Sequence, residues 1–475
     1  MKLTANHITT KRGSFELQNI SFSLNDKENL AVTGASGSGK TTLAKALCGQ
    51  LFLAGELKAD YSSHSNLLPK AMYVEQRYTI KNRSNTIDGY YQQRYNSSDN
   101  EDSYTVAEDL KFSSSDEKRI DFLLDELSIS YLKNKPLLQL SSGEHKRFQI
   151  VKALLEPVQL LVLDEPFVGL DVVSRKKLNE ILTAVSTAGT MLVVIAGARS
   201  HFPDCITHVL ELDNGTQKTF VKKDSFVAVN YAVTPVFNNS SLPLQKNSLN
   251  FENAILMKNV TVEYNNKLIL DNIHWQVKKG ERWLLKGKNG AGKSTLMSLV
   301  AADNPQAYSN EIYLFDKRRG SGESIWDIKK NIGFVSPELV AFFDRTVSCF
   351  DAVASGYFDT MVLNRKLSKE QTLHIYNWFE ALNVANLARK RLSEISAGMQ
   401  KIFLLIRTFV KNPPLLILDE PCQGLDEFQT DAFVQLLDNV CAQTDTTLVY
   451  ISHYANEAPA CITNVLELEN GKQIK

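Results

Sequence analysis

The chain has 475 residues, of which 43% are hydrophobic, and its 53 lysine and arginine residues balance its 53 aspartate and glutamate residues. A net charge of zero argues against a nucleic-acid-binding protein, which usually carries a basic excess or stripe. The six cysteines show no C-x-x-C spacing, which disfavours a zinc site, an iron–sulfur cluster or a disulfide framework and indicates a reducing, cytoplasmic environment. The N-terminus is too polar for a signal peptide, and no apolar run is long enough to span a bilayer, so any membrane crossing would require another chain.

The first predicted site is a glycine-rich loop at 34–41, which fits the phosphate-loop pattern of Gly, four residues, Gly-Lys and then Ser or Thr. An apolar strand is expected at 30–33 before it and a helix at 42–47 after it. The glycines let backbone N–H groups turn toward phosphate oxygens, and the helix N-terminus adds partial positive charge. Lys40 is expected to reach the β- and γ-phosphates, and Thr41 is expected to offer its hydroxyl to Mg²⁺. The predicted nucleotide-binding residues of this loop are Gly34, Ala35, Ser36, Gly37, Ser38, Gly39, Lys40, Thr41 and Thr42.

A polar stretch from 82 to 115 is rich in Ser, Asn, Asp and Tyr. We interpret it as an irregular, solvated surface insertion rather than a base-stacking platform, because basic residues are sparse there. Farther on, residues 140–147 read Leu-Ser-Ser-Gly-Glu-His-Lys-Arg, and a helix is expected from Phe148 onward. Ser141, Ser142 and Gly143 can bind a phosphate through hydroxyl and backbone N–H groups, although such a serine can equally be a simple helix cap.

An apolar run at 160–163 ends in Asp164 and Glu165. At the end of a buried strand, Asp164 would lie beside the phosphate loop and hold Mg²⁺ directly or through water. Glu165 is a candidate to polarise the attacking water. A further apolar strand is expected at 191–195. Strands that alternate with helices predict an α/β domain with a mainly parallel sheet covered by helices.

The second half of the chain repeats the first. A second phosphate loop occupies 287–294, and Lys293 stands 253 positions after Lys40. The run Leu-Leu-Val-Leu-Asp-Glu-Pro at 160–166 recurs as Leu-Leu-Ile-Leu-Asp-Glu-Pro at 415–421, which makes chance a poor account of either motif. We therefore predict tandem P-loop domains at 1–221 and 253–475, joined by an Asn-, Ser- and Pro-rich linker at 222–252. The predicted residues of the second half are Gly287, Lys288, Asn289, Gly290, Ala291, Gly292, Lys293, Ser294 and Thr295 for the nucleotide, Ser294 and Asp419 for Mg²⁺, and Glu420 for the attacking water.

These motifs resemble those of the ATP-binding cassette (ABC) ATPases along both halves of the chain. The resemblance implies, for each half, a mixed or parallel β-core with flanking helices and a helical subdomain, and hydrolysis of ATP with Mg²⁺. It identifies the phosphate loops as Walker A, the Asp-Glu strands as Walker B, 140–147 and 395–401 as signatures, and 169–171 and 424–426 as D-loops. The tandem arrangement is similar to that of ModF-type proteins associated with molybdate transport. The further residues that it implies are Gln76 in a Q-loop as a metal ligand, His453 as a switch histidine, Tyr264 as an adenine-stacking ring, and Ser396, Ala397 and Gly398 in the second signature.

The family pairs two cassettes head to tail, so that each ATP lies between the phosphate loop of one cassette and the signature of the other. A covalent tandem can form such a pair within one chain. Site two, built on the second loop, keeps the aromatic ring and the histidine. Site one has Lys11 at the place of the ring and Gly197 or Ala198 at the place of the histidine. Its partner signature has Ala397 where glycine is usual. We therefore predict that site two hydrolyses ATP and that site one mainly binds it.

Three roles remain open at this point. The first is the energising subunit of a membrane transporter, which would sit on the cytoplasmic face of the plasma membrane with a separate permease. The second is a soluble ATPase that acts on another cytosolic assembly, and the third is a binding or regulatory module with feeble turnover. The short polar linker and the absence of cysteine clusters disfavour the translation-factor, ribosome-recycling and DNA-repair types of tandem cassette. However, Pro337 replaces the Q-loop glutamine of the second half, so a nonstandard partner or none is also possible.

Overall fold

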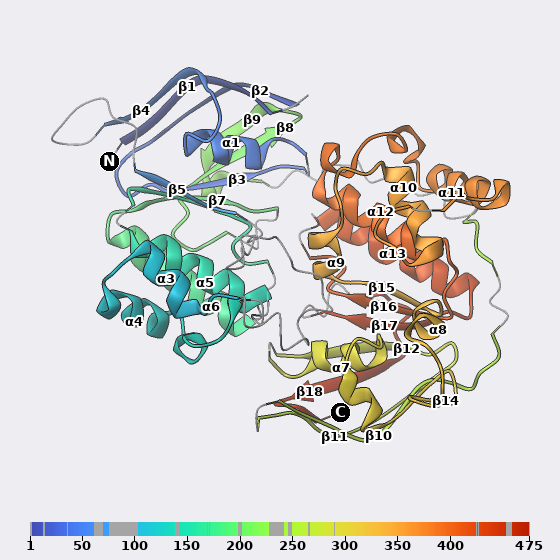
Figure 1. Cartoon of the computed structure of the whole chain (residues 1–475). Coiled ribbons are helices and arrows are strands. Elements are labelled where there is room, and N and C mark those ends of the chain that lie inside the picture. The colour runs from blue at the N-terminus through green and yellow to red at the C-terminus, as the bar shows by residue number, and fades with distance from the viewer. Residues whose placement is uncertain are drawn as a thin grey trace. The chain divides into compact units, whose positions relative to one another are not determined.

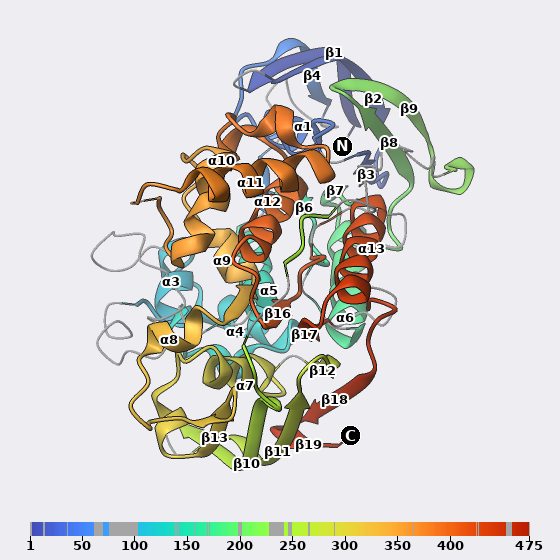
Figure 2. The same ribbon diagram turned by 90° about the vertical axis from the view of Figure 1, so that its right-hand side faces the viewer.

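Each half of the chain folds as a unit of its own in the computed structural model, and the described residues of the two units lie within 2–227 and 242–474 (Figure 1, Figure 2). Over these residues, no helix is both long and apolar enough to cross a membrane. The structure describes residues 2–12, 15–35, 37–60, 70–75, 103–137, 140, 142–156, 158–168, 170, 172–197, 202–227, 242–245, 249–264, 267–288, 290–363, 365–423, 425, 427–452 and 458–474.

The described strands of the first unit form one nine-stranded sheet. They are β1 (Lys2–Arg12), β2 (Phe15–Leu24), β3 (Leu30–Thr33), β4 (Ala54–Asp60), β5 (Ala71–Val74), β6 (Leu160–Asp164), β7 (Met191–Ile195), β8 (His208–Asp213) and β9 (Thr216–Lys222). Their order is β4-β1-β2-β9-β8-β3-β7-β6-β5. The strands from β8 to β5 run parallel, whereas β1 pairs antiparallel with β2 and β4. This mixed sheet confirms the α/β fold expected for the first half.

Helices cover both faces of the parallel part of this sheet, with α3 to α6 on one side and α1 on the other (Figure 1). Those described are α1 (Lys40–Leu47), α3 (Val106–Ser113), α4 (Glu117–Glu126), α5 (Ser142–Leu155) and α6 (Val172–Thr187). On β6, Leu161 and Leu163 pack in the core under α3–α6, whereas Leu160 and Val162 pack in the core under α1. Because successive side chains of a strand point to opposite faces, a strand covered on both faces is apolar throughout. The run at 160–163 is therefore apolar until Asp164, which ends the strand.

The second unit repeats this arrangement with two sheets. Its described strands are β10 (Asn253–Tyr264), β11 (Lys267–Lys278), β12 (Arg282–Gly287), β13 (Glu311–Leu314), β14 (Lys317–Arg318), β15 (Ile332–Val335), β16 (Leu415–Asp419), β17 (Thr447–Ile451), β18 (Asn464–Glu469) and β19 (Lys472–Gln473). The order β15-β16-β17-β12-β18-β19 matches β5-β6-β7-β3-β8-β9 strand for strand, and β11-β10-β13-β14 form a separate antiparallel sheet. Its described helices are α7 (Lys293–Val300), α8 (Ile325–Lys329), α9 (Pro337–Phe342), α10 (Cys349–Ala354), α11 (Lys369–Ala381), α12 (Ala397–Phe409) and α13 (Glu427–Gln443).

The duplication extends to single backbone conformations. Asn19 and Asn272 stand 253 positions apart, and both have a φ angle of 54°. Ser128 and Asn383 end corresponding helical turns with φ of 53° and 54°. Residues with side chains adopt this left-handed region uncommonly, and asparagine is enriched among those that do. The repeated sequence therefore encodes the same turns twice.

One expectation about secondary structure is wrong. The stretch from 82 to 115, expected to be irregular throughout, contains helix α3 in its described part. Thr105 caps this helix, because its hydroxyl accepts from the Glu108 N–H at 3.2 Å and the Glu108 carboxylate accepts from the Thr105 N–H at 2.8 Å. Such a capping box has a readable sequence signature, Thr-x-x-Glu before apolar positions. The polar composition around it hid that signal.

Candidate functional site

The first phosphate loop joins the end of β3 to the start of α1. Gly34 has a φ angle of 135°, and a Cβ atom there would lie 2.1 Å from the carbonyl oxygen of Leu212, so only glycine fits. The Lys40 ammonium donates to the carbonyl oxygens of Gly34 and Ala35 at 2.6 and 2.8 Å. The loop therefore wraps around the lysine amine, which points to where a bound phosphate would lie.

The second phosphate loop, between β12 and α7, has the same construction. Gly287 has a φ angle of 153°, and a Cβ atom there would lie 2.4 Å from the carbonyl oxygen of Leu468. The Lys293 ammonium donates to the carbonyl oxygens of Gly287 and Lys288 at 2.7 and 3.1 Å. Both halves thus provide a buried or half-buried ammonium group inside a glycine cradle, which fits a polyphosphate ligand.

A buried hydroxyl distinguishes the two loops. Ser38 is 2% exposed, and its Oγ has no hydrogen-bond partner among the residues that the structure describes. The corresponding residue of the second loop is Ala291, which has no polar side-chain atom. A buried polar atom without a partner is costly unless a ligand satisfies it. The first loop therefore has a donor available for phosphate that the second lacks.

Two residues predicted to bind the metal, Thr41 and Asp164, lie together in the first unit. The Thr41 hydroxyl donates to Asp164 Oδ2 at 3.0 Å, and the Tyr73 hydroxyl donates to the same oxygen at 2.7 Å. Hydroxyl and carboxylate oxygens are the ligands that Mg²⁺ prefers, so this pair fits that ion. In the second unit Ser294 lies in the first turn of α7 and Asp419 ends β16, which are the corresponding positions. Tyr73 was not predicted from the sequence.

The two glutamates after the Asp-Glu strands have the same unusual backbone. Glu165 and Glu420 have φ angles of 47° and 46°, and each N–H donates to the neighbouring strand, at 3.0 Å to the Ile195 carbonyl and at 2.9 Å to the Ile451 carbonyl. Burial raises the pKa of Glu165 to about 7, and the Asp164 charge acts in the same direction. At neutral pH this carboxyl group can therefore both hold and release a proton.

The Glu165 carboxylate has a partner at the place of the missing histidine. The backbone N–H of Gly197 donates to it, and this contact opposes the rise in its pKa, as does the Lys40 charge. Gly197 is one of two residues that match His453 by sequence offset. A backbone amide thus provides a hydrogen bond at this position of the first unit, but no imidazole.

The two signature sequences lie at the starts of helices α5 and α12. The first helix begins at Ser142, and the expectation of a start at Phe148 is wrong because residues 142–147 carry no apolar side chain that would mark the helix in the sequence. In the second unit the Ser396 hydroxyl caps α12 by accepting from the Met399 N–H at 3.3 Å. The helix-cap interpretation of this serine is therefore correct for the unliganded chain, and the cap leaves the helix N-terminus available for an anion.

Two buried lysines of the signature helices were missed in the sequence. Lys146 is 3% exposed, and its ammonium donates to the carbonyl oxygens of Glu75 at 2.9 Å and Asp164 at 3.1 Å. Lys401, 255 positions later, is 5% exposed and donates to the carbonyl oxygens of Pro421, at 3.2 Å, and Gln423. Burial lowers the pKa of Lys146 to about 8. The sequence did contain a signal for these lysines, because they stand 255 positions apart, at the same offset as the two Asp-Glu strands.

The predicted adenine-binding positions differ between the halves. Tyr264 ends β10 with a half-buried ring, and its hydroxyl accepts from the Asn304 amide at 2.8 Å. Lys11 is exposed and pairs with Glu16 at 3.2 Å. Of these two positions, Tyr264 therefore provides a fixed aromatic face and Lys11 does not.

The replaced Q-loop residue has a structural reason. Pro337 is the first residue of α9, where its missing N–H costs nothing, and the Ser336 hydroxyl caps this helix by accepting from the Leu339 N–H at 3.2 Å. The second unit therefore starts a helix where the family has its glutamine. The predicted residues Ser36, Gln76, Ser141, Asn289 and His453 lie outside the described part of the chain, as do Gly169, Asp171, Gly424 and Asp426, and the side chains of Ser142 and Ala397 are not described.

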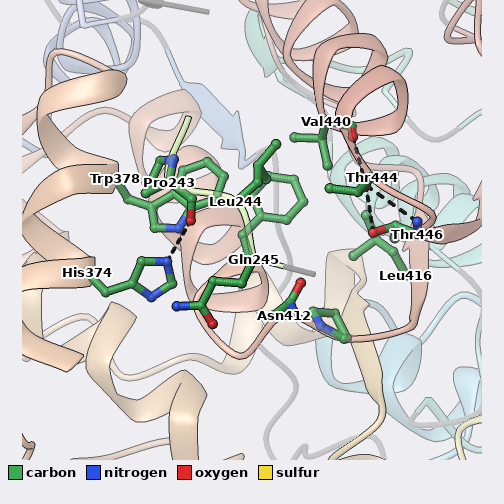
Figure 3. Close-up of a pocket in the computed structure, with 12 residues that line it drawn as sticks. Pro243, Leu244, Gln245, His374, Trp378, Asn412, Leu416, Val440, Thr444 and Thr446 are labelled. Carbon is green, nitrogen blue, oxygen red and sulfur yellow. Dashed lines mark hydrogen bonds between the residues drawn. The ribbon is translucent and has the colours of Figure 1, made fainter. Parts of the chain in front are cut away.

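A pocket of the second unit lies away from this chemistry. It is lined by residues that precede strands β16 and β17, among them Pro413 and Thr446, together with part of the connecting segment (Figure 3). His374 Nε2 lies 2.8 Å from the Pro243 carbonyl oxygen, and its Nδ1 lies 2.7 Å from the Tyr357 hydroxyl. The phosphate loop lies at the carboxyl ends of the strands, whereas this pocket lies at their opposite ends, where His374 contacts the connecting segment.

Each unit has a phosphate loop, an Asp-Glu strand and a signature helix on the same order of strands. These features define a tandem of ATP-binding cassettes. The family model described as ABC transporter matches residues 17–168 and 270–423, and the chain belongs to this family. Its domains bind ATP and hydrolyse it, so the chain is an ABC ATPase.

The similarity to known proteins extends over nearly the whole chain. The chain is 35% identical to the ABC transporter ATP-binding protein ModF of Escherichia coli (strain K12), over 95% of this chain and 93% of ModF. It is 31% identical to an uncharacterized ABC transporter ATP-binding protein of Schizosaccharomyces pombe, over 96% and 95% of the two chains. The solved structure of RNase-L Inhibitor has the same fold, with a TM-score of 0.55 at 16% identity, over 99% of this chain and 89% of the other.

Proposed function

We propose that the chain is a Mg²⁺-dependent ATPase with two unequal sites, in which site two hydrolyses ATP and site one mainly binds it. The observation that carries the inequality is the residue at the place of the switch histidine, where the first half has Gly197 or Ala198 and the Gly197 N–H faces the Glu165 carboxylate. The second half has His453 at the matching place in the sequence. An amide bonded to the carboxylate cannot exchange a proton with the phosphate, whereas an imidazole can donate one or bind the transferred group.

In site two, each residue has a defined task in phosphoryl transfer to water. Lys293 binds the β- and γ-phosphate oxygens, and Ser294 and Asp419 hold Mg²⁺, whose charge offsets that of the phosphates. Glu420 orients the attacking water, and His453 stabilises the charge that develops on the γ-phosphate. In site one, Lys40, Thr41 and Asp164 bind Mg·ATP in the corresponding way, with Glu165 in the place of Glu420. Gln76 is a further proposed metal ligand there.

We propose that the cassettes, with boundaries near 221 and 253, pair head to tail within one chain. The N-termini of α5 and α12 then supply the second half of each site, with Ser142 and Gly143 at site two and Ser396 and Gly398 at site one. A helix N-terminus presents free N–H groups and partial positive charge to an anion. A Cβ atom at Gly398 would lie 2.2 Å from the Gln429 Oε1, so a larger residue there would require this flexible side chain to move.

Steady-state turnover of Glu165→Gln and Glu420→Gln tests the inequality, because the two variants change the same atom at equivalent places. Loss of the water-orienting carboxylate at site two should lower kcat by about 10²–10⁴-fold. The Glu165→Gln chain should retain at least half of the wild-type rate. Binding of a fluorescent ATP analogue verifies that both variants still bind nucleotide. Equal losses of turnover in the two variants would contradict the proposal.

For the cellular role, we propose an ATP-binding subunit of a membrane transporter of molybdate type, which acts at the cytoplasmic face of the membrane with a separate permease. Similarity to ModF over nearly the whole chain supports this class. A second candidate is an ATPase that acts on another cytosolic assembly. Helix α9 supports it, because Pro337 replaces the glutamine that normally senses the partner of a cassette.

A pull-down of the tagged Glu420→Gln chain with ATP, from membrane and soluble fractions separately, distinguishes these roles. This variant is expected to hold the closed pair, and so to retain its partner. Recovery of a polytopic membrane protein at a fixed ratio would support the transporter. Recovery with a soluble assembly, and without a membrane protein, would support the second candidate and contradict the first.

A further inference from the structure

Tyr73 lies next to the metal-binding pair of the first cassette. It is on β5 opposite Val162 of β6, and Asp164 lies two residues beyond Val162 on the same face of the sheet. The Tyr73 hydroxyl therefore reaches Asp164 Oδ2 at 2.7 Å, the same oxygen that accepts from Thr41 at 3.0 Å. The three side chains form one hydrogen-bonded cluster.

The second cassette has the same register but another side chain. Phe334 of β15 lies opposite Ile417 of β16, and Asp419 lies two residues beyond Ile417. Phe334 thus occupies the place of Tyr73 and has no hydroxyl to donate. The difference between the cassettes at this position is a single oxygen atom.

The ring of Tyr73 is fixed from two sides. The Lys45 ammonium lies 5.6 Å from the centre of the ring, and it also pairs with Glu75 Oε1 at 3.2 Å. Lys45 and Thr41 are one turn apart on α1, so a single helix positions both the metal-binding hydroxyl and the cation over the ring. The ring also packs on the core formed by α1 and the first strands. The phenol is therefore held ready before any ligand binds.

We infer that Tyr73 is a positioning residue for Mg²⁺ in the first cassette. Its O–H donates to Asp164 Oδ2 and fixes the orientation of this carboxylate, which together with the Thr41 hydroxyl would hold Mg²⁺. Partners of this kind orient a metal-binding carboxylate, and their loss typically costs 10–100-fold in metal affinity. The inference rests on the proposed role of Thr41 and Asp164 as Mg²⁺ ligands. It explains how site one can bind Mg·ATP firmly although it lacks other features of a hydrolytic site.

Titration of Mg²⁺ against the fluorescence of methylanthraniloyl-ATP tests the inference in the full-length chain. The Lys293→Ala background removes nucleotide binding by the second cassette, so the signal reports the first. Tyr73→Phe should raise the Mg²⁺ concentration at half-saturation by about 10-fold or more. Binding of the analogue in EDTA, without metal, should stay within twofold of the parent.

The converse substitution is the matched control. In a Lys40→Ala background, which leaves only the second cassette, Phe334→Tyr should lower the Mg²⁺ midpoint. Asp164→Asn in the Lys293→Ala background tests the metal site itself. An unchanged Mg²⁺ midpoint in this variant would show that Asp164 does not hold the metal. If Asp164→Asn shifts the midpoint and Tyr73→Phe does not, the metal site stands and the role of Tyr73 is wrong. An equal loss of binding with and without Mg²⁺ in Tyr73→Phe would also overturn it, because it would show a structural effect alone.

Discussion

Glu165 and Glu420 share one strained backbone conformation, with φ angles of 47° and 46°, at the same place of two units that are 255 positions apart in sequence. Such a conformation costs about 1–3 kcal/mol for a residue with a side chain. In both units the glutamate N–H is held by the next strand, through the carbonyls of Ile195 and Ile451. Because the turn is kept twice, we interpret it as the device that aims each carboxylate toward its phosphate loop.

The pH dependence of site one should follow the protonation of Glu165. Burial raises the pKa of its carboxyl group to about 7, so below pH 7 most of the free enzyme carries a protonated group that cannot orient water as a base. In the Lys293→Ala background, residual kcat/KM should therefore rise with pH through a midpoint near 7. The same profile in Lys293→Ala with Glu165→Gln is the control and should be flat. A rise of equal size in the control would exclude Glu165 as its source.

Alanine at the first glycine of either loop should damage that cassette alone. A Cβ atom would lie 2.1 Å from the Leu212 carbonyl oxygen at Gly34, and 2.4 Å from the Leu468 carbonyl oxygen at Gly287. Since backbone atoms cannot yield cheaply, we expect each variant to lose about 2 kcal/mol or more of stability and to lose nucleotide binding in its own cassette. Calorimetry and nucleotide titration measure both effects. Gly189→Ala tests positive φ without a clash, because nothing lies within 4 Å of a Cβ atom there.

Ser38→Ala should separate stability from binding in the first loop. The buried hydroxyl lacks a partner among the described residues, so its removal should stabilise the unliganded chain by about 1 kcal/mol. Nucleotide affinity of the first cassette should fall, because the hydroxyl would no longer bond a phosphate oxygen. The second cassette carries Ala291 naturally, and Ala291→Ser is the reverse test. Unchanged affinity in Ser38→Ala would show that this hydroxyl does not contact the ligand.

The buried Lys146 predicts an alkaline gain in stability. Burial lowers its pKa to about 8 from an ordinary value of 10.5, so between these values the unfolded chain binds more protons than the folded chain. Stability should therefore rise with pH across this window, and the gain should be lost as the pH falls through 8. Urea unfolding at pH 7.5 and pH 10 measures it. Lys146→Met should flatten the dependence, whereas Lys118→Met, at an exposed lysine, should not; equal slopes in both variants would contradict the assignment.

The sequence by itself determined the tandem and its two phosphate loops. Each loop is encoded in contiguous residues, because only glycine tolerates the backbone conformation and the close neighbours at positions 34 and 287. The apolar runs before Asp164 and Asp419 were equally readable, since strands covered on both faces cannot carry polar residues. The helix within 82–115 was mispredicted because the polar composition around it hid its capping box, and the true start of α5 was mispredicted because residues 142–147 carry no apolar side chain.

Only the tertiary structure decided which side chains meet at each site. Thr41 and Asp164 are 123 residues apart, and their contact follows from the order β5-β6-β7-β3, which no local pattern specifies. The same order brings Tyr73 onto Asp164 and the Gly197 N–H onto the Glu165 carboxylate. Local motifs restrict the conformation of neighbouring residues, whereas contacts between strands depend on how the whole chain buries its apolar faces. The difference between the two metal sites therefore depends on the pairing of β5 with β6, which only the tertiary structure shows.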